Sequence, residues 1–191
     1  MDALFGIMTA FGLSASAGLN AYIPLLVVGV IAHYTNWINL KSPYNLLANP
    51  WVLIVVGILL IVEMLADKIP AVNHINDIIQ TGIRPAAGAI IFAASAHVIT
   101  NVHPVIAIIC GLLVSGSVHV VKSAAIRPAV TATTGGAGNI PVSIAEDVVA
   151  TGLSILSIMI PALVAVFLVL FVVLIIWWLW RRTNRKHQAI S

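Results

Sequence analysis

The stretch from Lys122 to Asp147 concentrates residue types that could bind a charged ligand. Its glycines at 135, 136 and 138 precede an expected helix, and threonines just before them add hydroxyl groups. Successive backbone N–H groups ahead of a helix N-terminus can hold an anion, and arginine binds phosphate or carboxylate through paired hydrogen bonds. The pattern predicts an anion site with the candidate residues Lys122, Arg127, Arg84, Thr133, Thr134, Gly135, Gly136, Asn139 and Asn20.

A second interpretation uses the carboxylates of the same regions. Asp77, Glu146 and Asp147 would relay protons or hold a cation with hard oxygen ligands, a common role of acids at membrane depth. Both interpretations can coexist in a symporter. In a third, the acids and bases simply pair with one another and hold broken helices together, because buried pairs are often structural. Glu63 and Asp67, four residues apart, are interpreted as interfacial acids that pair with Lys68 or Arg84.

The composition identifies the setting in which these residues must work. Of 191 residues, 61% are apolar and only 8% are charged, against about a quarter charged in a soluble domain. The chain is therefore expected to be a polytopic membrane protein with one domain, residues 1–191. Four of the nine basic residues lie in the tail 181–191, which indicates a topology signal and not a nucleic-acid-binding surface.

Six apolar segments predict an all-α protein of about six transmembrane helices, since a span needs roughly 20 residues. They cover residues 3–34, 51–65, 73–98, 104–121, 143–160 and 162–180. Glycine and proline predict broken or re-entrant segments at Gly18–Pro24, Ile69–Asp77 and Arg127–Pro141, and a kink before Pro85. Ser143 and Glu146 have the spacing of a capping box, which predicts a helix start there.

The distribution of basic residues predicts the orientation. With six spans, the tail, Lys68, Lys122 and Arg127 all fall on the cytoplasmic side, and Lys41 is the only base outside. The protein is thus expected in the cell (inner) membrane with both termini cytoplasmic.

Two halves, 1–99 and 103–180, show a faint internal repeat. DIIQTGI at 77–83 resembles DVVATGL at 147–153, GLSASAGLNAYIP resembles GLLVSGSVHVVKSAAIRP, and IRPA occurs at 83 and at 126. A 3+3 repeat suggests the inverted halves of many transporters. However, both Asp-containing helices would start from the same side, which a strict inversion forbids.

Signals of an enzyme are missing from the sequence. It has no Gly-x-Ser-x-Gly elbow and no His-Glu-x-x-His motif. His33, His97 and His103 lie on separate segments without metal-ligand spacing, so neither a metal nor a cofactor is expected. Cys110 lies alone in an apolar segment and cannot form an intrachain disulfide.

Three blocks of this sequence resemble a family of small bacterial membrane proteins, domain of unknown function 4126. The blocks are GLNAYIPLL, then ADKIP followed by VNHINDIIQTGIRPAAGA, and then HVVKSAAIRPAVTATTGGAGNIPVSIAED. The resemblance covers nearly the whole chain. It implies an integral membrane protein and carries no activity with it.

We expect a transporter or channel-like protein for a small anionic solute or a lipid phosphate, with protons as an optional coupling ion. The alternatives are a non-transporting scaffold or assembly protein, and a cation- or proton-conducting transporter. The expected partners are the bilayer and the anionic solute or lipid head group, and homo-oligomerisation is left open. A scaffold should show Asp77, Arg84, Arg127 and Asp147 in closed pairs, whereas a transporter should show them along an open cleft.

Overall fold

The computed structural model describes residues 2–99 and 103–188, in which helices are joined by turns and loops and no strand occurs. A short 3-10 turn (Tyr44–Ala48) joins α2 to α3, and a π-helical turn, η2 (Lys122–Ile126), joins α5 to α6. The α-helices are α1 (Asp2–Leu19), α2 (Tyr22–Tyr34), α3 (Pro50–Ala66), α4 (Pro70–Ile99), α5 (Pro104–Val121), α6 (Arg127–Thr134), α7 (Asn139–Met159) and α8 (Pro161–Gln188).

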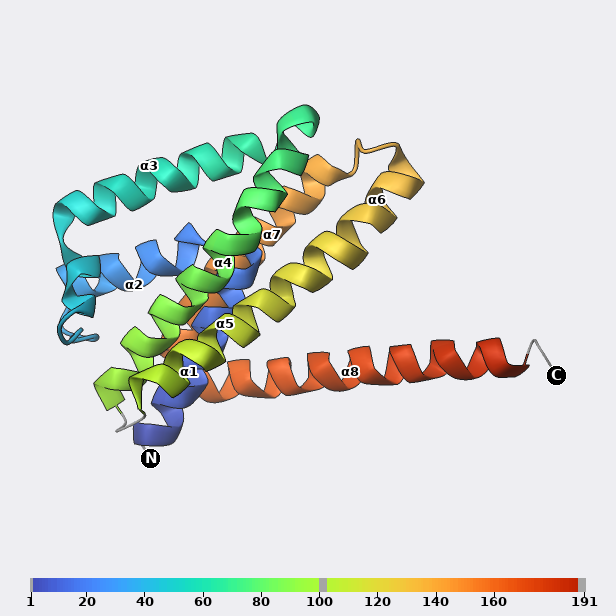
Figure 1. Cartoon of the computed structure of the whole chain (residues 1–191). Helices are drawn as coiled ribbons and strands as arrows, with labels where there is room; N and C mark the ends of the chain where they lie inside the picture. Colours follow the sequence, from blue (N-terminus) through green and yellow to red (C-terminus); the bar gives the residue numbers. More distant parts are fainter. Residues whose placement is uncertain (1, 100–102, 189–191) are drawn as a thin grey trace.

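Helices α1, α4, α5 and α7 form the centre of the molecule (Figure 1). Small residues let them approach closely: an added Cβ at Gly111 would clash with the backbone of Gly88. Ser14 Oγ donates to the carbonyl oxygens of Gly111 and Gly88, at 2.9 and 3.3 Å. Close backbone approach through small residues, sealed by serine hydrogen bonds, is typical of helix packing in membranes.

The direction of each helix follows from contacts at the two ends of the bundle. Ala10 of α1 packs with Phe92 of α4 and Ala107 of α5, and Tyr44 packs against the same cluster. At the other end of α1, the Leu19 carbonyl oxygen accepts a hydrogen bond from Lys122 Nζ, at 3.0 Å. Helices α1 and α5 therefore run in one sense and α4 and α7 in the other (Figure 1). The chain after α2 returns toward the end of the bundle where α1 begins, since Tyr44 packs against the cluster that contains Ala10.

Apolar side chains cover much of the outer surface. On α3, only Glu63 is buried, while Ile54, Ile58 and Ile61 are exposed. Helix α8 contacts α1 and α7 near its start and then extends away from the bundle (Figure 1). Such surfaces suit a lipid environment.

Three helical stretches among the described residues are long and apolar enough to cross a membrane: Ile75–Ser95, Pro104–Thr134 and Asn139–Met159. Shorter apolar helices cover Leu4–Leu19, Tyr22–Tyr34 and Pro50–Ala66. The fold is thus that of an all-α membrane protein, as the composition predicts.

Several predicted boundaries agree with the structure. The chain breaks between Leu19 and Tyr22, inside the predicted interruption Gly18–Pro24. Helix α5 starts at Pro104, and α7 ends just before Pro161.

The predicted interruption at Arg127–Pro141 is much shorter than expected, because only residues 135–138 leave the helical path. Pro128 fits at the start of α6, where the preceding turn is π-helical, and Pro141 lies in the first turn of α7, where its missing N–H is not needed. The capping box is also wrong: α7 starts at Asn139 and Ser143 lies inside it. Helix α4 likewise starts at Pro70 instead of near Asn73 and continues through Pro85.

Candidate functional site

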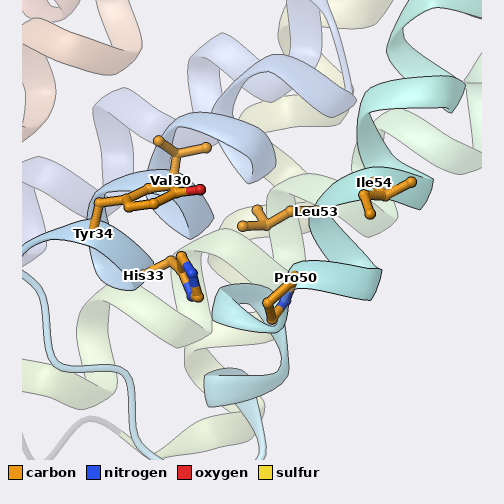
Figure 2. Close-up of a pocket in the computed structure, with 6 residues that line it drawn as sticks. All are labelled: Val30, His33, Tyr34, Pro50, Leu53 and Ile54. Carbon is orange, nitrogen blue, oxygen red and sulfur yellow. The ribbon is translucent and has the colours of Figure 1, made fainter.

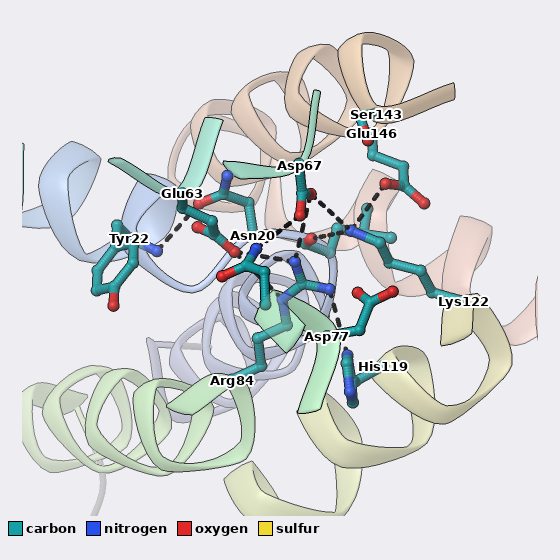
Figure 3. A network of polar contacts seen from close by, with 12 residues as sticks. Asn20, Tyr22, Glu63, Asp67, Asp77, Arg84, His119, Lys122, Ser143 and Glu146 are labelled. Carbon is teal, nitrogen blue, oxygen red and sulfur yellow. Dashed lines mark hydrogen bonds and ion pairs between the residues drawn. The ribbon is translucent and has the colours of Figure 1, made fainter. Parts of the chain in front are cut away.

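Charged side chains from five parts of the chain meet between the helices, and we call this group the charge network (Figure 3). It joins α3 and the turn after it to α4, η2, α6 and α7 through direct ion pairs. Its members are Glu63, Asp67, Asp77, Arg84, Lys122, Arg127 and Glu146. Except for Asp77, whose side chain is 19% exposed, each of these side chains is less than 10% exposed.

Asp67 lies at the centre of the charge network. Its Oδ2 is 2.9 Å from Arg127 Nη2 and 3.7 Å from both Arg84 Nη2 and Lys122 Nζ. Asn76 donates to Oδ1 at 2.7 Å. Burial raises the pKa of Asp67, but Lys122, Arg127 and Arg84 together outweigh burial and hold its pKa below the ordinary value.

Arg84 is fully buried and connects α4 to α3 and α5. Its Nε and Nη2 both donate to Glu63 Oε1, at 3.3 and 2.9 Å, and its Nη1 donates to His119 Nδ1 at 3.2 Å. His119 Nε2 lies 3.1 Å from the Thr81 hydroxyl, whose own proton goes to the Asp77 carbonyl oxygen. Nδ1 must therefore accept and Nε2 must donate, so the imidazole is neutral.

Lys122 and Arg127 face the same side because of the π turn between them. Five residues of an α-helix would separate their directions by about 140°, whereas the wider π turn brings them together. Lys122 Nζ lies 2.7 Å from Glu146 Oε2. Arg127 reaches Asp77 at 3.3 Å, Glu146 at 3.4 Å and the Ser143 hydroxyl at 3.1 Å.

Asn20 and Asp147 form a separate pair where α1 meets α2. Asn20 Oδ1 accepts from the backbone amides of Tyr22 and Ile23, at 3.1 and 3.2 Å. Its Nδ2 must then donate to Asp147 Oδ1, at 2.9 Å. Asn20 thus satisfies the start of α2 and holds Asp147 at the same time.

The glycine-rich turn lies at the surface and away from the buried cations. Gly135 and Gly136 have φ of 63° and 93°, the left-handed geometry that ends a helix such as α6. The Thr134 hydroxyl donates to Val130 and accepts from the Gly138 amide, and Thr133 donates to Ala129 and Val130.

The predicted anion-site residues therefore fall into two groups, apart from Asn20, which pairs with Asp147. Arg84, Lys122 and Arg127 meet in the charge network, together with Asp77 and Glu146. Thr133, Thr134, Gly135, Gly136 and Asn139 lie at the far end of α6, about 12 Å along the helix from Arg127. The Asn139 side chain donates to Thr131, so the contacts of this turn are local.

Sequence reasoning missed Asp67, Glu63 and His119 as site residues. The sequence places Glu63 and Asp67 on one helix face at the end of an apolar segment. Of the two predicted partners, Lys68 or Arg84, the structure shows Arg84 for both acids, which are buried and not interfacial. The position of His119, one turn before Lys122, also indicated a common face.

A groove of about 290 Å³ lies elsewhere, between α2 and α3 (Figure 2). His33 stands at its edge and bonds the Ala48 carbonyl oxygen at 2.8 Å. No member of the charge network lines this groove, whose residues are Val30, His33, Tyr34, Pro50, Leu53 and Ile54.

A family model described as domain of unknown function (DUF4126) matches residues 7–181. The chain belongs to this family. The match includes the whole charge network and the glycine-rich turn of this DUF4126 protein. No curated protein and no solved structure matches the chain.

The family has no known function, so the geometry of the charge network is the basis for the function proposed for this DUF4126 protein. Four carboxylates and three cations meet between apolar helices. All of these side chains except that of Asp77 are less than 10% exposed.

Proposed function

We propose that the protein is a membrane transporter that moves a small anionic solute or a lipid phosphate head group and couples this movement to protons. The observation that carries the proposal is the burial of Arg84, Lys122 and Arg127 among helices of membrane-spanning character. Buried ion pairs contribute little net stability, because desolvation offsets most of their attraction. Ionisable groups at membrane depth more often mark a pathway for ions or protons.

Exchange of partners supplies a mechanism. Arg127 contacts three carboxylates, those of Asp67, Asp77 and Glu146. Protonation of an acid weakens its hold on the guanidinium, which can then bind an anionic group through paired hydrogen bonds. Loss of the proton restores the carboxylate and displaces the anion. This competition would couple anion and proton movement in the same direction.

The orientation that we propose keeps the basic tail, Lys68, Lys122 and Arg127 on the cytoplasmic side of the inner membrane. The six-span prediction counts residues 3–34 as one crossing and puts both termini in the cytoplasm. The packing favours a re-entrant α1–α2 pair instead, since Ala10 and Tyr44 meet at the same end of the bundle. Five crossings, α3, α4, α5–α6, α7 and α8, then place the N-terminus outside.

We also infer an internal repeat that relates α1 to α5 and α4 to α7. Alignment of the repeated motifs matches Ser16 with Ser115 and Ser154 with Arg84. Ser16 Oγ lies 2.8 Å from Ser154 Oγ, and Ser115 Oγ donates to the Arg84 carbonyl oxygen at 2.7 Å. Matched helices run in the same sense (Figure 1), which favours a parallel repeat over an inverted one.

A scaffold or assembly role is the second candidate. It is favoured by the closed ion pairs of Arg84 and Arg127, since a scaffold needs no open cleft. If the protein is a transporter, the same closed ion pairs belong to an occluded state, in which the charge network is open to neither side of the membrane.

Reconstitution distinguishes the two candidates. Liposomes containing the protein are tested for uptake of a panel of phosphates, carboxylates and polyprenyl phosphates, with and without a proton gradient. We expect gradient-dependent uptake of at least one compound, abolished in Arg127→Ala, partly restored in Arg127→Lys and unchanged in Lys41→Ala, which removes an exposed loop cation. Folded protein that moves no compound of the panel would favour the scaffold, and uptake unaffected in Arg127→Ala would remove Arg127 from the transport mechanism.

A further inference from the structure

The charges of the network do not balance. Glu63, Asp67, Asp77 and Glu146 face only three cations, and the neutral His119 imidazole adds no positive charge. One negative charge is therefore left over. An uncompensated charge in a buried site is costly, and proteins usually avoid it by neutralising the group.

The cations are shared unequally among the four acids. Asp67 has ion pairs with all three cations, and Glu146 pairs with Lys122 and Arg127. Asp77 pairs with Arg127 and is partly exposed. Glu63 is only 2% exposed and pairs with Arg84 alone. The excess negative charge is thus least compensated at Glu63.

The hydrogen bonds around Glu63 agree with its lack of compensating charge. Both bonds from Arg84 end on Oε1, although a carboxylate can receive an arginine fork on its two oxygens. Oε2 is buried and has no hydrogen-bond partner among the described residues. Asp77 Oδ1 and Glu146 Oε1 are also buried without a hydrogen-bond partner among the described residues, but Asp77 is partly exposed and Glu146 pairs with two cations. A proton on Glu63 Oε2 would turn an unpartnered acceptor into a donor.

We propose that Glu63 is the proton-binding residue of the network and carries its proton on Oε2 in this closed state. The groups that face it are Arg84 from α4, Lys122 from η2 and Asp67 from the end of its own helix. Tyr22 of α2 is near enough to Glu63 and to Gln80 to interact with both electrostatically. Binding adds one proton to the carboxylate and gives a neutral carboxyl.

The proton at Glu63 gives the transport cycle a defined coupling step, and in that role the inference rests on the proposed function. With Glu63 neutral, Arg84 keeps its hydrogen bonds to Oε1 but loses the opposite charge. Its guanidinium can then attract an anion or Asp67 more strongly. Release of the proton restores the Glu63–Arg84 ion pair and expels the anion.

Infrared spectroscopy of the protein in liposomes measures the proton directly. A neutral carboxyl gives a C=O stretching band separate from carboxylate and amide bands, and the band shifts when H2O is replaced by D2O. At neutral pH we expect this band in the wild type and its loss in Glu63→Gln. Asp147→Asn, which lies outside the charge network, is the control and should keep the band.

Two outcomes would overturn the assignment: a wild-type protein without the band at neutral pH, or a band that persists in Glu63→Gln. Thermal unfolding adds an independent readout. Glu63→Gln imitates the protonated state and should unfold at nearly the wild-type temperature, whereas a large loss of stability would show an ionised Glu63. Neither readout requires transport. If the band is present in a protein that transports nothing, Glu63 still binds the proton, and only its role in transport is refuted.

Discussion

Replacing Lys122 with methionine tests whether the charge network is held by mutual compensation. The substitution keeps an unbranched side chain of similar length and removes the cation that lies 2.7 Å from Glu146 and 3.7 Å from Asp67. The removal of one partner from a buried pair costs about 3–5 kcal/mol, because the remaining charge is left uncompensated. The Leu19 carbonyl oxygen also loses its donor, at about 1 kcal/mol.

A double-mutant cycle isolates the Lys122–Glu146 interaction. In Lys122→Met combined with Glu146→Gln, the uncompensated carboxylate is gone, so the combined loss should be smaller than the sum of the single losses. A coupling energy of about 1.5–3 kcal/mol is expected for groups in direct contact within one network. Lys41→Met, at an exposed loop position, should change stability by no more than about 0.5 kcal/mol.

The assay is unfolding by denaturant and by heat in mixed micelles, followed by the loss of helical circular dichroism. For a chain of this size, about 4 kcal/mol corresponds to a shift in melting temperature of roughly 8–16 °C. A Lys122→Met protein as stable as Lys41→Met would refute the reasoning. Strictly additive losses would show that Lys122 and Glu146 do not depend on each other.

The remaining predictions concern topology and packing. Single cysteines at positions 42 and 188, in a Cys110→Ala background, should react with impermeant thiol reagents from opposite sides of the membrane, and an N-terminal tag should be accessible from the side of position 42. A tag on the side of position 188 would restore the six-span arrangement. Gly111→Ala should destabilise the fold because its Cβ meets the backbone of Gly88, whereas Gly152→Ala, with nothing within 4 Å, should gain up to about 1 kcal/mol in unfolding measurements.

The sequence indicates the helices of this fold better than it indicates how they meet. Pro104 and Pro161 mark helix starts because proline fits the first turn and ends the preceding helix. Asn20 marks a true break, since its side chain satisfies the amides at the start of α2. These are local effects, and local sequence carries them.

The charge network depends on contacts between distant segments, which local patterns do not specify. Glu63 and Asp67 look like interfacial acids until α4 brings Arg84 against them. The glycines after Thr134 have the pattern of an anion-binding loop, but in the structure they end α6 with positive φ. Ser143 has cap spacing, yet it lies inside α7 as a partner of Arg127.

Solvent access to the charge network is the most direct test of the transport proposal. Ser143 is 1% exposed and bonds Arg127, so a cysteine there in the Cys110→Ala background reports opening. We predict slow reaction with an impermeant thiol reagent in liposomes, at a rate that changes with pH and with the transported anion. Complete protection of the position 143 cysteine in folded protein under every condition, beside full reaction of Ser42→Cys, would contradict the proposal.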